Sequence, residues 1–250
     1  MRLLERTSRG VELTAAGKAV LHRARQILNQ VDQVHADLAE HASGGRGHVR
    51  IQASASAISQ FLPMDLAKFS ARVPQAAIAL EERFSGEIAQ AVREGVADIG
   101  IIMEGTPVQD LQCFDYKVDK LVAVIPRTHP VRGRSIVFSS LLDYEFVGLE
   151  GATAITRLLT DQASVLKKPM RTRIQVHSFA ALCKMIEAGF GVGVLPEGAA
   201  RSFIASMRLR MVRLADEWAR RQMHICVRDY ALLSPVSQKL VDHLRQGASD

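Results

Sequence analysis

The chain has 250 residues, of which 48% are hydrophobic and 23% are charged, so it can fold around more than one modest core. No run of about 18 apolar residues occurs, and the charged N-terminus (MRLLERTSRG) lacks the apolar stretch of a secretory signal. We therefore expect neither a transmembrane span nor a signal peptide. Three cysteines far apart in sequence fit reduced thiols in a cytoplasmic protein.

The net charge of +6 is concentrated at the N-terminus. Residues 1–25 carry six Lys and Arg against two Glu. A positive segment of this kind suits contact with phosphate groups. It suits equally well the solvated basic face of a helix, and charge alone leaves both interpretations open.

Residues 1–13 are short, polar in the middle and apolar at both ends. The central stretch contains Arg6, Arg9 and a glycine, which predicts a small β-hairpin with a basic tip. Thr14 follows at the position where a helix N-cap is expected, because its hydroxyl can accept a free backbone N–H of the next turn.

A 3.5-residue apolar repeat follows the hairpin and predicts one helix over residues 14–41. Spacings of four and three residues alternate along it, which is typical of a coiled-coil seam. The stripe could instead lie on the protein's own core, but no second helix is close in sequence, so we expect dimerisation. Residues 43–47 (SGGRG) form a linker. The seam consists of Leu13, Gly17, Val20, Ala24, Ile27, Val31, Val34 and Leu38.

Strands and helices alternate after the linker. The order strand–helix–strand–helix–strand predicts a parallel sheet with right-handed crossovers, and two further strands follow. The expected strands cover residues 48–53, 76–84, 98–103, 111–116 and 121–125, and the expected helices cover 58–73 and 87–94.

A second unit repeats this alternation. Two α/β units without a long linker between them predict a bilobed α/β architecture with a cleft between the lobes. The expected strands of the second unit cover residues 145–149, 171–176, 191–195 and 223–228, and the expected helices cover 155–166, 179–188 and 235–245.

Catalytic and cofactor motifs are incomplete in this sequence. The segment around Gly189, Gly191 and Gly193 lacks the third glycine of a dinucleotide fingerprint. The eight histidines have no metal-ligand spacing, and neither a Walker motif nor a Gly-x-Ser-x-Gly elbow occurs. We therefore expect no enzyme activity, no cofactor and no metal.

Hydroxyl side chains stand where strands end and helices begin. Ser54 and Ser56 follow the first strand after the linker, Thr153 follows the first strand of the second unit, and Ser178 precedes a helix. Free backbone N–H groups and helix dipoles favour anions at such places, and ligands of open α/β sheets bind beyond the carboxyl ends of strands. Each hydroxyl could also serve only as an N-cap, and both readings stay open.

Five segments in this order carry a family resemblance: Leu4–Gly17, Gly45–Ile51, Gly95–Ile101, Val122–Pro130 and Ala188–Glu197. The first segment resembles the wing and the helix that follows it, and the second resembles the entry to the effector domain. The third resembles a strand that begins with Gly-x-x-Asp. The fourth resembles the strand that crosses into a second lobe, and the fifth resembles a glycine-rich strand. In this combination the chain resembles the LysR-type transcriptional regulators over essentially its whole length.

The resemblance implies a two-lobed effector domain like the periplasmic binding proteins, with two crossover strands. It also implies that a small, often anionic metabolite binds between the lobes. Two serines would donate from the first helix, one serine from the second lobe, and the remaining residues would form the wall and edge of the cleft. The implied site residues are Ser54, Ser56, Gly151, Thr153, Ser178 and Pro196.

The resemblance divides the chain into four parts. The first is the remnant of a winged helix-turn-helix, and the second is a linker and dimerisation helix. Effector lobes I and II follow, and the chain returns to lobe I at its end. The expected boundaries are 1–14, 15–43, 47–125 together with 227–250 for lobe I, and 126–226 for lobe II.

Members of this family place three helices before the wing, including the recognition helix. The chain is expected to begin at or after that helix, so only Arg6 and Arg9 would touch DNA phosphate, without reading sequence. The implied partners are promoter DNA through a largely absent domain, a small effector, and further copies in a homodimer or homotetramer, with no membrane. The alternative is a free-standing solute-binding protein, against which the heptad helix and the missing signal peptide count.

Overall fold

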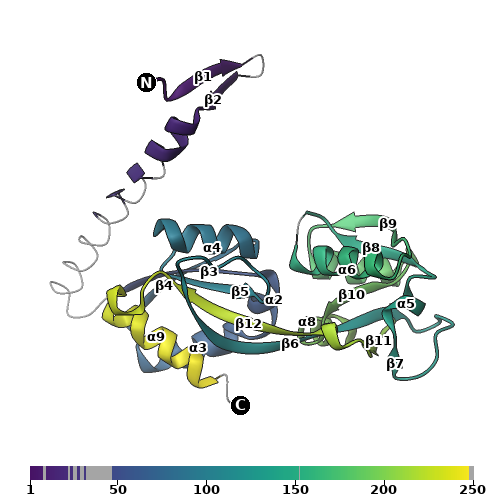
Figure 1. The fold of residues 1–250 in the computed structure, drawn as a ribbon. Helices are drawn as coiled ribbons and strands as arrows, with labels where there is room; N and C mark the ends of the chain where they lie inside the picture. Colours follow the sequence, from purple (N-terminus) through teal and green to yellow (C-terminus); the bar gives the residue numbers. More distant parts are fainter. Residues whose placement is uncertain are drawn as a thin grey trace.

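A computed structural model gives the fold of most of the chain. Figure 1 shows two α/β lobes, together with an N-terminal hairpin that leads into a short helical stretch. Within the described ranges, none of the helices has the length and apolar character that crossing a membrane requires. The described residues are 1–7, 10–21, 23, 24, 27, 28, 31, 47–151 and 153–247.

The N-terminal hairpin has the predicted form. β1 (Leu4–Thr7) pairs antiparallel with β2 (Gly10–Leu13). Thr14 caps the helical residues that follow, because its Oγ1 accepts the Gly17 N–H at 2.9 Å. A Cβ atom on Gly17 would lie 1.9 Å from the Leu3 carbonyl oxygen. The hairpin therefore rests on the first helical turn through a contact that requires glycine.

The beginning of the predicted heptad helix is described. From Val20 onward its described seam side chains are exposed in the single chain, as they would be in a coiled coil without its partner, whereas Leu13 is half-buried and Gly17 is buried. Arg6 is also exposed, on β1. Three further predicted positions, Arg9, Val34 and Leu38, lie outside the described residues. The helical residues are 15–21, 23, 24, 27, 28 and 31, and the exposed seam positions among them are Val20, Ala24, Ile27 and Val31.

Lobe I is built on a sheet with the strand order β4-β3-β5-β12-β6. β3 pairs in parallel with β4 and β5, as the alternation of strands and helices predicted. β12 comes from the end of the chain and runs antiparallel to β5 and β6. The strands are β3 (His48–Ala53), β4 (Ala77–Glu82), β5 (Ile99–Met103), β6 (Gln112–Pro126) and β12 (Arg220–Val227).

Helices cover both faces of this sheet (Figure 1). Ile99 and Ile101 of β5 pack with α2, α3 and α9 on one face, whereas Ile102 packs with α4 on the other. This alternation follows from the two-residue period of a strand. The helices are α2 (Ala55–Gln60), α3 (Leu62–Arg72), α4 (Ser85–Glu94) and α9 (Pro235–Gln246), and the 3₁₀ turn η2 covers Tyr230–Leu232.

Lobe II surrounds its own core. Two parallel strands, β8 (Glu145–Leu149) and β9 (Arg171–Val176), form a small sheet. The far half of β6 pairs with β10 and β11, and β11 pairs with β7. The remaining elements are β7 (Ser135–Ile136), β10 (Gly193–Pro196), β11 (Leu209–Leu214), α5 (Phe138–Leu141), α6 (Ala154–Val165), α7 (Phe179–Glu187), α8 (Glu197–Ile204) and the 3₁₀ turn η1 (Glu217–Ala219).

The crossover strands differ from the prediction. Instead of two strands at 111–116 and 121–125, β6 is one strand of 15 residues that runs through both lobes. The lobe junction also lies earlier than expected on both strands. Residues 121–125 belong to the lobe II core, and residues 223–227 contribute to the lobe I cores. The polar stretch before residue 121 reads like a turn, but its pairing with β12 keeps it extended.

Some helices also differ from the prediction. The helix expected at 58–73 is two helices, α2 and α3, which are separated at Phe61, and Pro63 lies in the first turn of α3. α2 begins directly after Ser54, so Ser54 is its N-cap and Ser56, which was also expected before the helix, lies in its first turn. The sequence reasoning also missed the short elements β7, α5, α8 and β11.

Candidate functional site

A cleft of about 390 Å³ lies between the lobes, and the first residues of four helices line it. α2 and α4 reach it from lobe I, whereas α6 and α7 reach it from lobe II. Each of these helices follows a strand of a parallel pair, which places their N-termini at the carboxyl ends of the strands. The lining includes four of the predicted residues, Ser54, Ser56, Thr153 and Ser178.

Ser54 presents a buried hydroxyl to this cleft. Its backbone N–H donates to the Ile101 carbonyl at 3.1 Å, which fixes the end of β3 beside β5. Its side chain makes no capping bond to α2, and its buried Oγ has no hydrogen-bond partner among the described residues. Such an unpaired buried group costs about 1–3 kcal/mol, so a ligand that bonded to it would remove this penalty. Ser56, in the first turn of α2, is also buried.

Thr153 and Ser178 act as N-caps, as the simpler reading proposed. The Thr153 Oγ1 accepts the Thr156 N–H at 3.0 Å, and the Ser178 Oγ accepts the Ala181 N–H at 3.2 Å. The Ser178 hydroxyl accepts one bond and keeps its own proton to donate. The Thr153 Oγ1 lies 2.8 Å from the Thr156 Oγ1, whose proton goes to the Leu149 carbonyl, so Thr153 donates its proton to Thr156. Ser178 can therefore cap its helix and still donate to a ligand, whereas the Thr153 proton is already used.

The ionic groups around the cleft are largely paired with one another. Arg83 forms an ion pair with Glu81, and the His177 Nε2 lies 3.0 Å from a carboxylate oxygen of Glu150. Glu87 accepts the backbone N–H of Phe84 at the start of α4. The positive ends of the α4, α6 and α7 dipoles add to the Ser54 hydroxyl, so the site favours a ligand that accepts hydrogen bonds.

Two predicted positions do not line the cleft. Gly151 has a φ of +82°, and a Cβ on it would lie 3.1 Å from the ring of Phe84, so it contacts a wall residue from the opposite lobe. Pro196 was expected at the cleft edge, but it is not among the residues that line this cleft. It is buried at the end of β10 opposite Leu121, because β10 runs antiparallel to the crossover strand β6 and ends at the lobe junction.

The sequence reasoning missed several residues that line the cleft. Arg83 and Phe84 follow β4, and Met103 ends β5. The rule that singled out Ser54, that ligands bind beyond strand ends, applies equally to these residues. Unlike Ser54, none of the three carries a hydroxyl group. His177 directly precedes Ser178 and could have been found in the same way.

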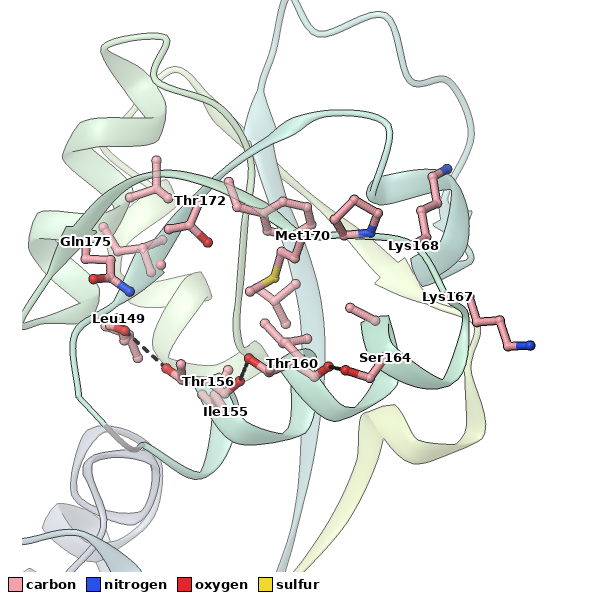
Figure 2. A pocket seen from close by; sticks show the side chains of 18 residues that line it. Leu149, Ile155, Thr156, Thr160, Ser164, Lys167, Lys168, Met170, Thr172 and Gln175 are labelled. Carbon is pink, nitrogen blue, oxygen red and sulfur yellow. Dashed lines mark hydrogen bonds between the residues drawn. The ribbon is translucent and has the colours of Figure 1, made fainter.

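A second pocket of about 440 Å³ lies inside lobe II, between α6 and the β8–β9 sheet. Figure 2 shows that the hydroxyl groups that α6 contributes to it bond to backbone carbonyls. The Thr156 Oγ1 donates to the Leu149 carbonyl at 3.1 Å, and the Thr160 Oγ1 donates to the Thr156 carbonyl at 2.9 Å. The pocket shares Leu149 and Ile155 with the cleft. Because these hydroxyl protons are already used, whereas the buried Ser54 Oγ has no partner among the described residues, the cleft is the better candidate for a ligand that accepts hydrogen bonds.

Among the described residues, no group of three or more His, Cys, Asp or Glu is placed to hold a metal ion.

Comparison with curated proteins finds bacterial transcriptional regulators. The chain is 26% identical over 242 residues to the "Uncharacterized HTH-type transcriptional regulator YbhD" of Escherichia coli (strain K12), covering 96% of this chain and 75% of the relative. It is 29% identical over 248 residues to the "Nitrogen assimilation regulatory protein nac" of the same organism, covering 97% and 79%.

Two solved structures share the fold. The effector binding domain of QuiR in complex with shikimate has a TM-score of 0.71 and 13% identity, covering 81% of this chain and 97% of that chain. Full-length CbnR complexed with its target DNA has a TM-score of 0.74 and 20% identity, covering 99% and 85%. Residues 42–249 match the LysR substrate binding domain, and the chain therefore belongs to the family of proteins that carry this domain.

Proposed function

We propose that this chain is the effector-sensing part of a ligand-responsive transcriptional regulator, and that its effector binds in the interlobe cleft. The observation that carries the proposal is the buried, unpartnered hydroxyl of Ser54 at a place where helices from both lobes begin. A ligand there contacts both lobes at once. It can therefore favour one lobe arrangement by as much as its affinity differs between arrangements.

The proposed ligand is a small anion such as a carboxylate. Helix N-termini and serine or threonine hydroxyls donate hydrogen bonds and favour negative charge. The cleft volume of about 390 Å³ suits a small metabolite. Ser54, Ser56, Thr153 and Ser178 are the proposed contacts, with Gly151 supporting the wall through Phe84. The structure of QuiR with shikimate supports a carboxylate in a domain of this fold.

The remaining parts of the proposal concern partners. The exposed seam residues support assembly with a second copy through the N-terminal helix. Arg6 and Arg9 are the proposed phosphate contacts of a wing. A regulator of promoter DNA acts in the cytoplasm and needs no catalytic group, so we propose that the chain is not an enzyme. The DNA-bound structure of CbnR supports a regulator rather than a free-standing solute-binding protein.

Thermal denaturation with shikimate, benzoate and glutamate tests the cleft. A ligand at about 100 times its Kd should add about 2.7 kcal/mol to the free energy of unfolding. The expected result is a saturable rise in Tm with at least one of these carboxylates that is lost when Ser54→Ala and Ser178→Ala are combined. A rise that survives this double substitution would place the ligand outside the cleft.

A further inference from the structure

Two cations face each other across the crossover strands. Lys120 of β6 and Arg220 of β12 are direct partners in the antiparallel register, and both are exposed. Like charges at directly opposed positions destabilise a strand pair. Among the described residues, neither side chain has an ion pair that would offset this repulsion.

The neighbouring step of the same ladder shows the opposite arrangement. Asp119 faces Arg221, and the two form a buried ion pair. The Asp119 Oδ1 also accepts a hydrogen bond from the Gln60 Nε2 at 3.0 Å. Because side chains alternate along a strand, this neutralised pair and the like-charged pair lie on opposite faces of the same two strands.

A third cation joins the like-charged pair. Arg213 of β11 is the register partner of Val122, and Val122 lies two residues after Lys120 on the same face of β6. Arg213 is exposed and, within the part of the chain that the structure describes, has no ion pair. Register therefore brings Lys120, Arg213 and Arg220 to one face at the lobe junction.

These three cations line a pocket of about 700 Å³. Two of its carboxylates already have partners. Glu197 forms an ion pair with Arg201 at 2.5 Å, and the Asp216 Oδ2 accepts the Phe138 N–H at 2.8 Å. The third, Glu217, lies in the 3₁₀ turn η1 just before β12. A bond to a neutral N–H does not cancel the Asp216 charge, and Glu217 has no ion pair among the described residues, so three cations against these two carboxylates leave the pocket with a formal charge of +1.

We propose that this junction pocket binds a multiply charged anion, either an organic phosphate or a polycarboxylate. Lys120 and Arg220 are on the crossover strands, and Arg213 is on a strand of lobe II, so the anion contacts the junction around which the lobes are arranged. This site is separate from the cleft, with which it shares no lining residue. Binding relieves the repulsion between the opposed cations and adds charge-assisted hydrogen bonds.

Titration calorimetry of the whole chain with pyrophosphate and with citrate, each at matched ionic strength in chloride, tests the site. The expected result is saturable binding of at least one anion. Arg213→Gln combined with Arg220→Gln should weaken it about tenfold or more, because two charged donors are lost. Binding of pyrophosphate would identify an organic phosphate as the ligand class, and binding of citrate would identify a polycarboxylate.

A matched control removes two exposed cations elsewhere in lobe II, through Arg157→Gln combined with Lys184→Gln. This control should bind like the parent chain, and Arg213→Lys combined with Arg220→Lys should retain most of the affinity. Ser54→Ala combined with Ser178→Ala should also retain it, which separates this site from the cleft. Equal losses in the site variant and in the matched control, or no saturable binding of either anion, would overturn the proposal.

Discussion

Gln60 of lobe I holds the first turn of α8 in lobe II, because its Oε1 accepts the Gly198 N–H at 2.9 Å. The Gln60 Nε2 bonds in turn to Asp119 of the crossover strand and to the Ser56 carbonyl of its own helix. A Cβ on Gly198 would lie 2.7 Å from the Gln60 side-chain oxygen. One amide thus connects a cleft helix, the crossover strand and the opposite lobe.

Gln60→Ala should loosen the contact between the lobes. It leaves a buried carboxylate with one bond fewer and frees the Gly198 N–H, at a cost of about 1–3 kcal/mol in unfolding free energy. Hydrogen–deuterium exchange should become faster at Gly198 and in the following turn of α8, and Tm should fall.

Ser59→Ala is the matched control for this change. Ser59 lies on the same helix but is exposed, and its hydroxyl makes one weak bond, to the Ser56 carbonyl at 3.4 Å. In the Ser59→Ala variant, hydrogen–deuterium exchange in α8 should match that of the parent chain. If Gln60→Ala left exchange in α8 unchanged, Gln60 would not hold the two lobes together.

Ser54→Ala should weaken ligand binding without lowering the Tm of the free chain. The Ser54 Oγ has no hydrogen-bond partner among the described residues, so its loss should leave the Tm of the free chain unchanged or slightly raised. The Tm rise produced by a cleft ligand should fall strongly. Ser178→Ala should instead lower the Tm of the free chain, because it removes an N-cap worth about 0.5–2 kcal/mol.

Ser164→Ala provides the control for both serine variants. Ser164 is an exposed residue of α6, and its hydroxyl bonds to the Thr160 carbonyl of its own helix, away from the cleft. It should preserve both the Tm and the ligand response. Full ligand stabilisation in Ser54→Ala would show that the buried hydroxyl is not a ligand contact.

The sequence predicted strand positions well but could not predict which strands pair. β3, β8 and β9 begin and end where expected, because short apolar or β-branched runs between polar turns are local signals. The rule for strand ends located Ser54, Thr153 and Ser178 in one cleft. Pro196 does not line this cleft with them, and the antiparallel pairing of β10 with β6 that places it is a non-local property.

Register explains the other features that the sequence could not reveal. Asp119 and Arg221 are about a hundred positions apart in the chain, and only the pairing of β6 with β12 makes them partners. The polar stretch around Asp119 therefore reads as a turn rather than as the middle of a strand. The opposed cations Lys120 and Arg220 are hidden from sequence reasoning for the same reason.

Val31→Asp should shift the protein toward smaller oligomers. Val31 is exposed in the single chain and lies on the predicted seam, where a buried carboxylate would oppose its copy in a partner helix. Light scattering after size exclusion should report a lower mass at equal concentration. Ala19→Asp adds the same charge at an exposed helical position off the seam, and it should leave the mass unchanged. Equal masses for Val31→Asp and the parent chain would contradict dimerisation through this helix.

Thiol labelling should distinguish the three cysteines by burial. Cys113 is exposed, whereas Cys183 and Cys226 are buried. Burial raises the pKa of Cys183 to about 11 and that of Cys226 to about 12, so at pH 8 only about one Cys183 thiol in a thousand is ionised. Burial also raises the pKa of Cys113, so its alkylation should be slow near neutral pH and should accelerate as the pH rises and the thiolate forms.

Iodoacetamide at pH 8 should therefore modify one thiol per native chain, at Cys113, as intact and peptide mass spectrometry would show. Unfolding in guanidinium should expose all three. Cys113→Ser should abolish labelling of the native chain, whereas Cys183→Ser should leave it at one thiol.

Because Cys226 is the direct cross-strand partner of Cys113, it is the sensitive reporter of the β6–β12 pairing. Rapid native labelling of Cys226 would mean that these crossover strands separate in solution.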